Sequence, residues 1–309
     1  MNRRTFLKTA TFATAGFSAA GAFAASEIHP KGVGMCDWTM GCMAKPECFA
    51  KAEKAGLSGV QVSVGGSPNS IPLRNADVCK QYLELSKKHN ITIHSVAAGG
   101  ILNKIPLKSE PQSAIYVLDA IEAARALGAN NILMAFFGKG DLRRKGEDGK
   151  PFNDLKEGEF SSYELDEQGV TRVVEVLRQI VPRAEDAGII LGLENTLSAK
   201  QNVEIIERVG SPMVQVYYDM GNSTYFGYDV PTEIRMLGKE RICEMHIKDK
   251  GCTVFSTGKG QVDMLAVAKA LKDIRYRKWM CLENGGRKNR FFKDVRDNIA
   301  YSKKTFSIR

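Results

Sequence analysis

Four acidic or imidazole side chains lie at the ends of four successive apolar runs: Glu194, Asp219, His246 and Glu283. The runs are short and rich in β-branched and other apolar residues, which is typical of buried parallel strands. Three carboxylates and one imidazole form an oxygen-rich ligand set that suits Mn²⁺, Mg²⁺ or Co²⁺ better than a structural zinc. A single Glu or His at such a position is usually a loop or core residue. Four at equivalent positions predict one divalent-metal site at the mouth of a barrel.

The elements that must position these residues alternate regularly along the chain. Strands are predicted at 32–37, 58–64, 91–97, 131–137, 189–194, 214–219, 242–247 and 278–283. Helices are predicted at 45–55, 75–89, 111–127, 166–187, 201–209, 231–237, 263–274 and 292–302. Eight such units favour an α/β fold of the (β/α)₈ TIM-barrel class over the alternative, a doubly wound open sheet. No GxGxxG motif follows the first strand, so dinucleotide binding has no support.

Two helices show the helical period of apolar residues clearly. The apolar stripes are Ile115, Leu118, Ile121, Ala124 and Leu127, and Val170, Val173, Val174, Leu177, Ile180 and Val181. Gly56, Gly128 and Gly188 each stand between a predicted helix and a predicted strand, where a C-terminal glycine ends the helix. The longest irregular segment, 138–165, follows the fourth strand and could be a lid or a subunit contact. No linker divides the chain, so residues 25–309 are predicted to form a single catalytic domain.

The N-terminus has the features of an export signal. Arg3 and Arg4 precede a weakly apolar stretch from 9 to 23, and Ala22-Phe23-Ala24 offers a small-x-small cleavage site. The pattern predicts a twin-arginine signal peptide over residues 1–24. This signal would be read by the twin-arginine translocation machinery, so the protein is expected to be exported to the periplasm. The apolar stretch is too short and too weakly apolar to span a bilayer as a stable helix.

Charge and cysteine content exclude several other classes. The formal net charge is +9, and +6 remains without residues 1–24, which contain three basic residues and no acid. The basic residues are spread out, so no nucleic-acid partner is expected. The cysteine number, seven, is odd, so at least one thiol is unpaired or pairs between chains. Two of Cys36, Cys42 and Cys48 could form a disulfide in an oxidising compartment. Cys243 and Cys281 lie in predicted strands as small buried residues.

The motifs LENT, YYDMGN, HIKD…GKGQVD and LEN occur in this order over the second half of the chain. The sequence resembles the sugar phosphate isomerase/epimerase family with xylose-isomerase-like barrels, which includes tagatose and psicose 3-epimerases, hydroxypyruvate isomerase, inosose dehydratase and endonuclease IV relatives. The resemblance covers essentially the whole mature chain. It implies that Glu194, Asp219, His246 and Glu283 bind Mn²⁺, and that Glu194 and Glu283 are the catalytic acid/base pair. Relatives with this barrel often pair, so a homo-oligomer is also implied.

Five further residues are candidates for substrate binding: Asn222, Lys248, His94, Trp38 and Gln61. Asn222 stands where many epimerases of the group have a His that touches the sugar; it could contact a hydroxyl or cap the following helix. His94 is as compatible with the core as with a substrate contact. Trp38 could form an apolar wall for one face of a sugar, and Gln61 lies on the second predicted strand.

Lys248 follows His246 by two residues and therefore points to the same side of the strand. It could bind a substrate oxygen or an anionic group. The alternative is a salt bridge to Asp249 or Glu244. Arg287, Lys288 and Arg290 could bind an anion too, but a solvated loop is the favoured interpretation of those three residues.

The favoured function is a divalent-metal-dependent sugar isomerase or epimerase that acts on a keto-sugar or related carbohydrate. Its Glu pair would transfer a proton through a metal-stabilised enediolate. The alternative is a lyase or dehydratase acting on an inosose or a 3-keto-glycoside with the same metal site. A phosphodiesterase like endonuclease IV is disfavoured, because that chemistry requires several His and this chain has four in all. The intact ligand set argues against a barrel that only binds sugar.

Overall fold

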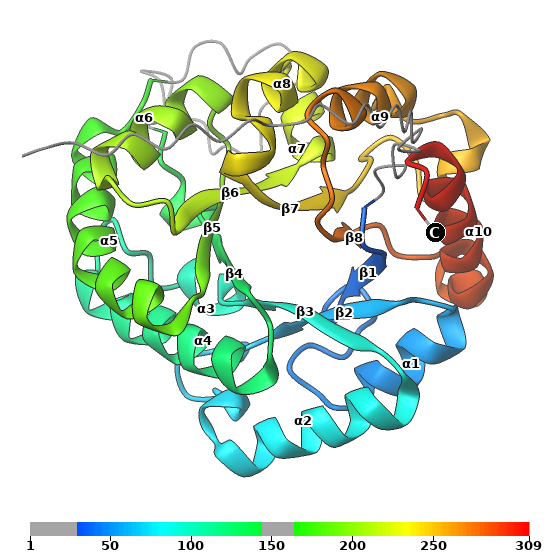
Figure 1. Ribbon diagram of the computed structural model, residues 1–309, viewed down its shortest axis with the longest axis horizontal. Coiled ribbons are helices and arrows are strands. Elements are labelled where there is room, and N and C mark those ends of the chain that lie inside the picture. Colours follow the sequence, from blue (N-terminus) through cyan, green and yellow to red (C-terminus); the bar gives the residue numbers. More distant parts are fainter. Residues whose placement is uncertain (1–29, 144–163, 309) are drawn as a thin grey trace, which may run out of the picture.

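Eight parallel strands close into a barrel in a computed structural model that describes residues 30–143 and 164–308 (Figure 1). Each strand pairs with its neighbour in sequence, and β1 pairs with β8 to close the ring. This closure confirms the predicted barrel and excludes the open sheet. The strands are β1 Val33–Cys36, β2 Gly59–Ser63, β3 Thr92–Ala97, β4 Asn131–Ala135, β5 Ile190–Glu194, β6 Val214–Asp219, β7 Ile242–Ile247 and β8 Met280–Leu282.

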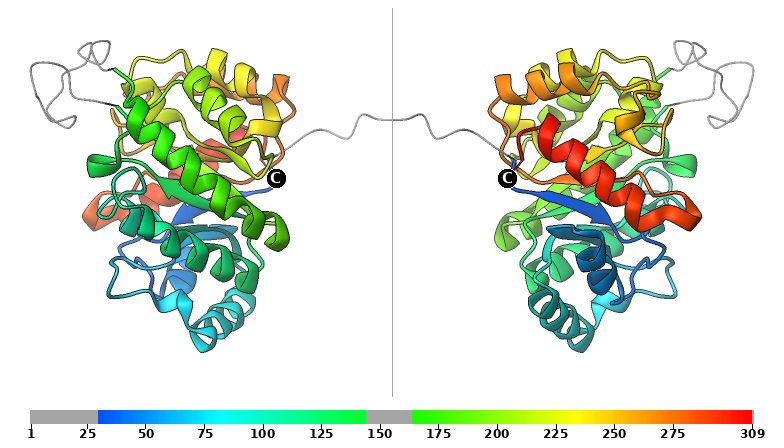
Figure 2. Two further views of the ribbon diagram at one scale, coloured as in Figure 1. Left: turned by 90° about the vertical axis from the view of Figure 1, so that its left-hand side faces the viewer. Right: turned by 90° about the vertical axis from the view of Figure 1, so that its right-hand side faces the viewer.

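Helices surround the barrel on its outside, as the view down the barrel and the two side views show (Figures 1 and 2). Helix α10, in red, lies beside α1 and β1, so the end of the described chain packs against its beginning. The helices are α1 Cys48–Ala55, α2 Ala76–His89, α3 Gly99–Leu102, α4 Ala114–Leu127, α5 Glu167–Ala187, α6 Ala199–Val209, α7 Met220–Tyr225, α8 Val230–Arg241, α9 Met264–Asp273 and α10 Phe291–Thr305.

Every predicted strand is present and every predicted long helix is present with shifts at its ends. Two short helices, α3 and α7, were not predicted; each follows a strand directly, at the carboxyl end of the barrel. The three predicted stop glycines end α1, α4 and α5 in the left-handed conformation, with φ of 81° at Gly56, 73° at Gly128 and 67° at Gly188. Only glycine adopts this conformation without steric cost, so these residues fix where the helices end.

One apolar stripe was placed correctly and the other only in part. The predicted stripe of α5 is entirely buried. In α4 the prediction for Ile115 is wrong, because 49% of this residue is exposed. The buried face of α4 instead includes Val117, Ala120 and Ala123 alongside Ile121. A helix this rich in Ala and aliphatic residues carries more than one apolar row, and only packing against the sheet selects among them.

The main apolar core lies between the strands and the surrounding helices, and the barrel interior is largely polar. A small apolar cluster of Ala97, Leu133, Ala135, Tyr217 and Cys243 lies apart from the main core. Buried polar groups are also numerous on the strands: Gln61, His94, Ser95, Asn131 and Glu244. Gly34 makes room for one of them, since a Cβ at this position would lie 2.1 Å from Nε2 of His94.

Two predictions concern segments outside the described residues. The signal peptide, residues 1–24, lies there entirely, and so does most of the irregular segment 138–165. The described start of that segment contains a short 3₁₀ helix, Gly138–Gly140, and Arg143 forms an isolated bridge with Leu165. Within residues 30–143 and 164–308, no helix combines the length and the apolar character needed to cross a membrane.

Candidate metal centre and substrate pocket

The four candidate ligands meet at the carboxyl end of the barrel. Glu194 ends β5, Asp219 ends β6, His246 lies near the end of β7, and Glu283 follows β8. One ligand atom from each lies within 4.8 Å of the others. Nδ1 of His246 is 3.2 Å from Oε1 of Glu194, 3.4 Å from Oε2 of Glu283 and 3.8 Å from Oδ2 of Asp219. The structure therefore brings together the side chains that the sequence singled out.

Asp219 is held in place by the element that begins after it. Its Oδ1 accepts a hydrogen bond of 2.7 Å from the backbone N–H of Asn222 and so caps helix α7. The register of β6 and β7 sets Asp219 beside His246. Oδ2 of Asp219 is buried and has no hydrogen-bond partner. A buried carboxylate oxygen that accepts no hydrogen bond and lies close to two further carboxylates and an imidazole is what a divalent cation would satisfy. The donor set fits such an ion.

The protonation equilibria of this cluster reflect its burial and its charges. Burial raises the pKa of Glu194, despite the opposing effect of His246. Burial alone would also raise the pKa of Asp219, but Lys248 and His246 outweigh it and hold this pKa well below its usual range. Burial opposes the charged form of His246 as well, yet Cys36, Glu194 and Glu283 outweigh it and raise the pKa of the imidazole. Without a metal, the cluster therefore depends on cationic side chains for charge balance.

Lys248 is one of these cations. Its Nζ lies 2.7 Å from Oε2 of Glu283 and 3.4 Å from Oδ2 of Asp219. Burial would lower its pKa, but Asp219 and Glu283 outweigh that effect and raise it well above the usual range. The partners of Lys248 are thus two candidate metal ligands. The predicted alternative, a salt bridge to Asp249 or Glu244, is wrong. Asp249 instead accepts backbone hydrogen bonds from Gly251, Gln261 and Val262, and so orders the loop after β7.

A cavity of about 410 Å³ opens over the candidate metal centre. Its polar lining includes Glu194, Glu283, Asn222, Lys248, Lys250 and Asn103, and its apolar lining includes Trp38, Met43, Leu133, Phe137 and Phe226. Nε1 of Trp38 donates a hydrogen bond of 3.2 Å to Oε1 of Glu283. The cavity has the size and the mixed lining of a small-molecule site. Asn222 lines the cavity. It does not cap helix α7, as one of the two expectations had it, because the cap is Asp219.

Gln61 and His94 do not line this cavity. Gln61 is fully buried beneath the candidate ligands, and its Oε1 lies 3.1 Å from Nε2 of His246. His94 lies deeper in the barrel. Its Nδ1 is 2.7 Å from Oε1 of Glu244, and its ring stacks on Trp279 with a centroid distance of 5.0 Å. Of the two roles that the sequence allowed for His94, core residue and substrate contact, its position fits that of a core residue. The substrate-contact role for Gln61 and His94 has no support in these positions.

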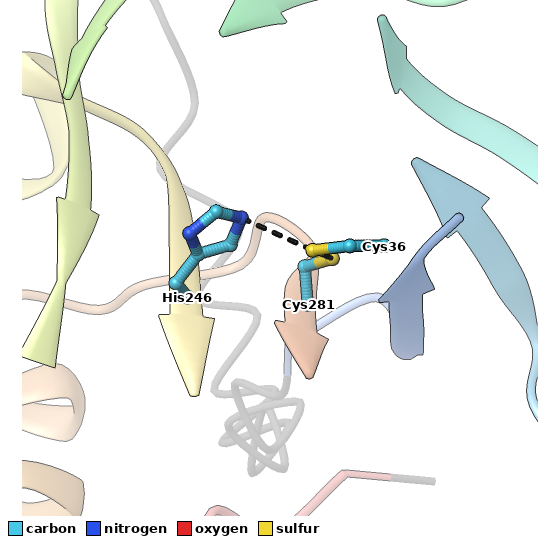
Figure 3. Close-up of side chains that lie close together, drawn as sticks. All are labelled: Cys36, His246 and Cys281. Atoms are coloured by element: carbon cyan, nitrogen blue, oxygen red, sulfur yellow. Dashed lines mark hydrogen bonds between the residues drawn. The ribbon is translucent and has the colours of Figure 1, made fainter. Parts of the chain in front are cut away.

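Two thiols lie against the other side of His246 (Figure 3). Sγ of Cys36 is 3.5 Å from Nε2 of His246 and 3.5 Å from Sγ of Cys281. Burial raises the pKa of both thiols, that of Cys281 to about 11. The register sets Cys281 opposite Gly34, two residues before Cys36. The two α-carbons are therefore roughly 8 Å apart, beyond the reach of a disulfide without backbone movement. All seven cysteines are free, so no bridge joins Cys36, Cys42 and Cys48.

The sequence contained an unused signal for the layer below the site. Side chains two residues apart on a strand point to the same face. Glu244 precedes His246 by two residues, Tyr217 precedes Asp219 by two, and Cys281 precedes Glu283 by two. All three lie buried inside the barrel and contact one another or their neighbours there. Applied to the predicted ligands, the period-2 rule therefore also predicts the layer of side chains that supports them.

Residues 49–305 match the family model described as the xylose isomerase-like TIM barrel. The chain belongs to this family. The 2-epi-5-epi-valiolone 7-phosphate 2-epimerase of Actinoplanes sp. is 24% identical over 221 residues, which are 70% of this chain and 72% of that protein. Similar solved structures include a D-psicose 3-epimerase in the presence of D-fructose, with a TM-score of 0.66 and 17% identity. They also include the 3-keto-D-glucoside 4-epimerase of E. coli, with a TM-score of 0.68 and 13% identity.

Each of these two structures covers 89% of this chain and is itself covered to 99%. At such low identity the structural likeness shows the fold alone. Together, the family match and the relatives support an enzyme of the isomerase or epimerase kind.

Proposed function

We propose that this protein is a divalent-metal-dependent epimerase or isomerase of a keto-sugar or related carbohydrate. The observation that carries the proposal is the position of Glu194 and Glu283. Both carboxylates belong to the candidate ligand cluster, and both line the cavity above it. A carbohydrate in that cavity would therefore meet two acid/base groups at the charged end of the pocket.

The chemistry follows from what these residues can do. A divalent ion, with Mn²⁺ as the first choice and Mg²⁺ or Co²⁺ as alternatives, would polarise the carbonyl and an adjacent hydroxyl of the substrate and so acidify the C–H between them. One Glu then removes this proton, and the other returns a proton to the opposite face or to the neighbouring carbon. The first outcome is epimerisation and the second is isomerisation. Asp219 and His246 hold the ion and transfer no proton.

The remaining lining groups suit a carbohydrate. Asn222 and Lys248 offer hydrogen bonds to hydroxyl oxygens, and Trp38 and Phe137 offer apolar walls for the C–H face of a sugar. The hydrogen bond from Nε1 of Trp38 also fixes the orientation of the Glu283 carboxylate. Trp38 therefore contributes both to the substrate wall and to the geometry of one proton-transferring group.

A lyase or dehydratase would share the first step. If a leaving group stands on the carbon next to the deprotonated one, its departure competes with reprotonation. The structural likeness to a 3-keto-D-glucoside 4-epimerase makes 3-keto-glycosides a substrate class worth including in the test. The product decides between these two reactions, because the proton abstraction itself is common to both.

The test is solvent-proton exchange followed by NMR. The purified protein is incubated in D₂O with Mn²⁺ or Mg²⁺ and a panel of ketoses, inososes and 3-keto-glycosides, with and without EDTA. We expect metal-dependent deuterium uptake at one carbon beside the carbonyl, abolished by EDTA. An intact carbon skeleton indicates an epimerase or isomerase, and loss of water or of an aglycone indicates the lyase. Absence of exchange across the panel, in protein with bound metal, would contradict the proposal.

We also propose that the protein acts outside the cytoplasm, from the twin-arginine pattern of its first 24 residues. Replacing both Arg3 and Arg4 by Lys should keep the protein in the cytoplasmic fraction. Fractionation of cells that produce the wild type and the variant measures this directly. Periplasmic accumulation of the double variant at the wild-type level would contradict the assignment.

A further inference from the structure

A chain of buried hydrogen bonds runs from His246 to a carboxylate deep in the barrel. Nε2 of His246 lies 3.1 Å from Oε1 of Gln61, and Nε2 of Gln61 donates a bond of 2.9 Å to the hydroxyl of Tyr217. The Tyr217 hydroxyl in turn donates to Oε1 of Glu244. Gln61, Tyr217 and Glu244 are at most 1% exposed, so solvent cannot replace any of these partners. The chain connects β7, β2, β6 and again β7.

The direction of the chain is set at its far end. The Glu244 carboxylate is surrounded by donors: besides Tyr217, it accepts bonds from Ser95 Oγ at 3.2 Å and from Asn131 Nδ2 at 3.0 Å, and Nδ1 of His94 lies 2.7 Å away. An ionised carboxylate only accepts hydrogen bonds. The Tyr217 hydroxyl must therefore give its single hydrogen to Glu244.

The remaining steps follow from that first one. Because the Tyr217 hydrogen is used, the Tyr217 oxygen can only accept from Gln61. This requirement orients the amide group of Gln61, with its NH₂ toward Tyr217 and its carbonyl oxygen toward His246. A carbonyl oxygen has no hydrogen to offer, and the nearby Cys36 thiol donates its hydrogen to this same Gln61 oxygen at 3.3 Å. Nε2 of His246 must therefore carry the proton. In the neutral imidazole, Nδ1 then holds the lone pair. Nδ1 is the atom that faces Glu194 and Glu283.

We infer that Gln61, Tyr217 and Glu244 are positioning residues that fix the tautomer of His246 and thereby direct its Nδ1 lone pair toward the metal. The inference rests on the metal site of the proposed function and adds to it the residues that select the ligand atom. A second-layer partner on the distal nitrogen of a metal-binding imidazole typically changes metal affinity by roughly 10- to 100-fold when it is lost. The inference also gives Gln61 a role in the site without any contact with substrate.

Glu244→Gln is the most direct test, because the new side chain has the same shape and can donate a hydrogen bond. It adds this donor at the residue that sets the direction of the hydrogen bonds in the chain. Its new NH₂ can donate to the Tyr217 oxygen, which frees the Tyr217 hydrogen to point toward Gln61. The Gln61 amide can then turn over and donate to Nε2 of His246, which moves the imidazole proton to Nδ1. Ser95→Ala is the matched control. It removes a donor to Glu244 and a longer contact of 3.4 Å to the Tyr217 hydroxyl, but it leaves the bonds from Glu244 through Tyr217 and Gln61 to His246 in place.

Two readouts test the inference in the full-length protein. Mn²⁺ affinity is measured by EPR titration, and the tautomer is measured from ¹⁵N shifts of labelled histidine in protein loaded with diamagnetic Zn²⁺. In the wild type we expect a protonated Nε2 and a metal-shifted Nδ1 on His246. In Glu244→Gln we expect a loss of Mn²⁺ affinity of roughly 10- to 100-fold and a signal from protonated Nδ1. In Ser95→Ala we expect both properties of the wild type.

Tyr217→Phe is the second variant if Glu244→Gln does not fold, and it should weaken Mn²⁺ binding in the same direction. Two results overturn the inference but leave the proposed metal site standing. One is a wild-type protein with the His246 proton on Nδ1, and the other is a folded Glu244→Gln variant with wild-type Mn²⁺ affinity and tautomer. A wild type that binds neither Mn²⁺ nor Zn²⁺ overturns the metal site of the proposed function and the inference together.

Discussion

The two candidate acid/base groups have different surroundings at the scale of single residues. Glu194 is buried against His246, whereas Glu283 is bound by Trp38 and Lys248 and is more exposed. Changing either to Gln removes the proton-transferring group but keeps an oxygen that can bind a metal. We expect proton exchange to fall by about 10²- to 10⁴-fold in Glu194→Gln and in Glu283→Gln. The D₂O exchange assay measures this fall, and full activity in both variants would contradict their assignment.

Lys248 would compete with the proposed metal ion, because its ammonium binds the same carboxylate oxygens of Glu283 and Asp219. Its Nζ lies 2.7 Å from Oε2 of Glu283 and 3.4 Å from Oδ2 of Asp219. A metal ion bound to these carboxylates would therefore be repelled by the positive charge of the ammonium. Replacing it by Met keeps most of the side-chain volume and removes the charge. We expect Lys248→Met to bind Mn²⁺ at least about tenfold more tightly, because a charge pair near 4 Å is worth several kcal/mol at an effective dielectric of about 20. Isothermal titration calorimetry checks this; equal or weaker binding would show that Lys248 and the ion do not share the site.

At this scale the sequence predicts which residues come together but not their depth. The strand-end rule identifies the four side chains that meet in the cluster. Trp38, Lys248 and Asn222, which were selected on other grounds, line the cavity. Gln61 and His94 also lie on strands and are also polar, yet they point into the barrel below the cavity. The sequence of one strand does not show how far that strand is shifted along its neighbour. In a barrel this shift in register decides at which depth along the barrel axis a side chain lies.

At the scale of elements, the close packing of β5 depends on a glycine. A Cβ at Gly192 would lie 2.6 Å from Sγ of Cys243 and 2.8 Å from the backbone oxygen of Ile132. We expect Gly192→Ala to lower the free energy of unfolding by about 1–3 kcal/mol or more through overpacking. Gly66→Ala is the control, because the nearest atom there is the flexible Met43 sulfur at 3.4 Å. Urea unfolding compares them, and equal midpoints would contradict the close-packing argument.

The elements themselves were largely predictable because most are long and periodic. The stop glycines and the alternating pattern locate all eight strands. Helices α3 and α7 escaped prediction because four and six residues are too few to show a period. They matter to the site nevertheless: Gly99 and Gly100 of α3 and Asn222 of α7 line the cavity.

At the scale of the whole molecule, Asp37 links folding to pH. This buried carboxylate follows β1 and accepts bonds from Ser63 and Ala44. Burial nevertheless raises its pKa to about 6. The folded protein therefore keeps this proton to a higher pH than the unfolded chain, whose Asp pKa is about 3.9. Stability from this group is present at low pH and is lost as the pH rises from about 4 to about 6.

The loss amounts to about 3 kcal/mol, since one pKa unit corresponds to about 1.4 kcal/mol. Asp37→Asn cannot ionise, so its free energy of unfolding should gain about 2 kcal/mol relative to the wild type between pH 4 and pH 7. The rest of the loss occurs below about pH 4, where the unfolded chain begins to release this proton. Any constant effect of the substitution cancels in this difference. Urea unfolding at both pH values measures it, and parallel stability curves for the two proteins would refute the role of Asp37.

The ligand cluster comes entirely from β5 to β8, whereas much of the opposite wall of the cavity follows β1, β3 and β4. The candidate ligands and much of the remaining cavity lining are therefore contributed by different halves of the barrel. In the proposed enzyme, mutations at Asn103 or Phe137 would change the fit of the carbohydrate without removing a contact of Glu194 or Glu283. If the proposed function holds, substrate choice could be redesigned through segments of the first half of the chain while the metal-binding residues of the second half are kept.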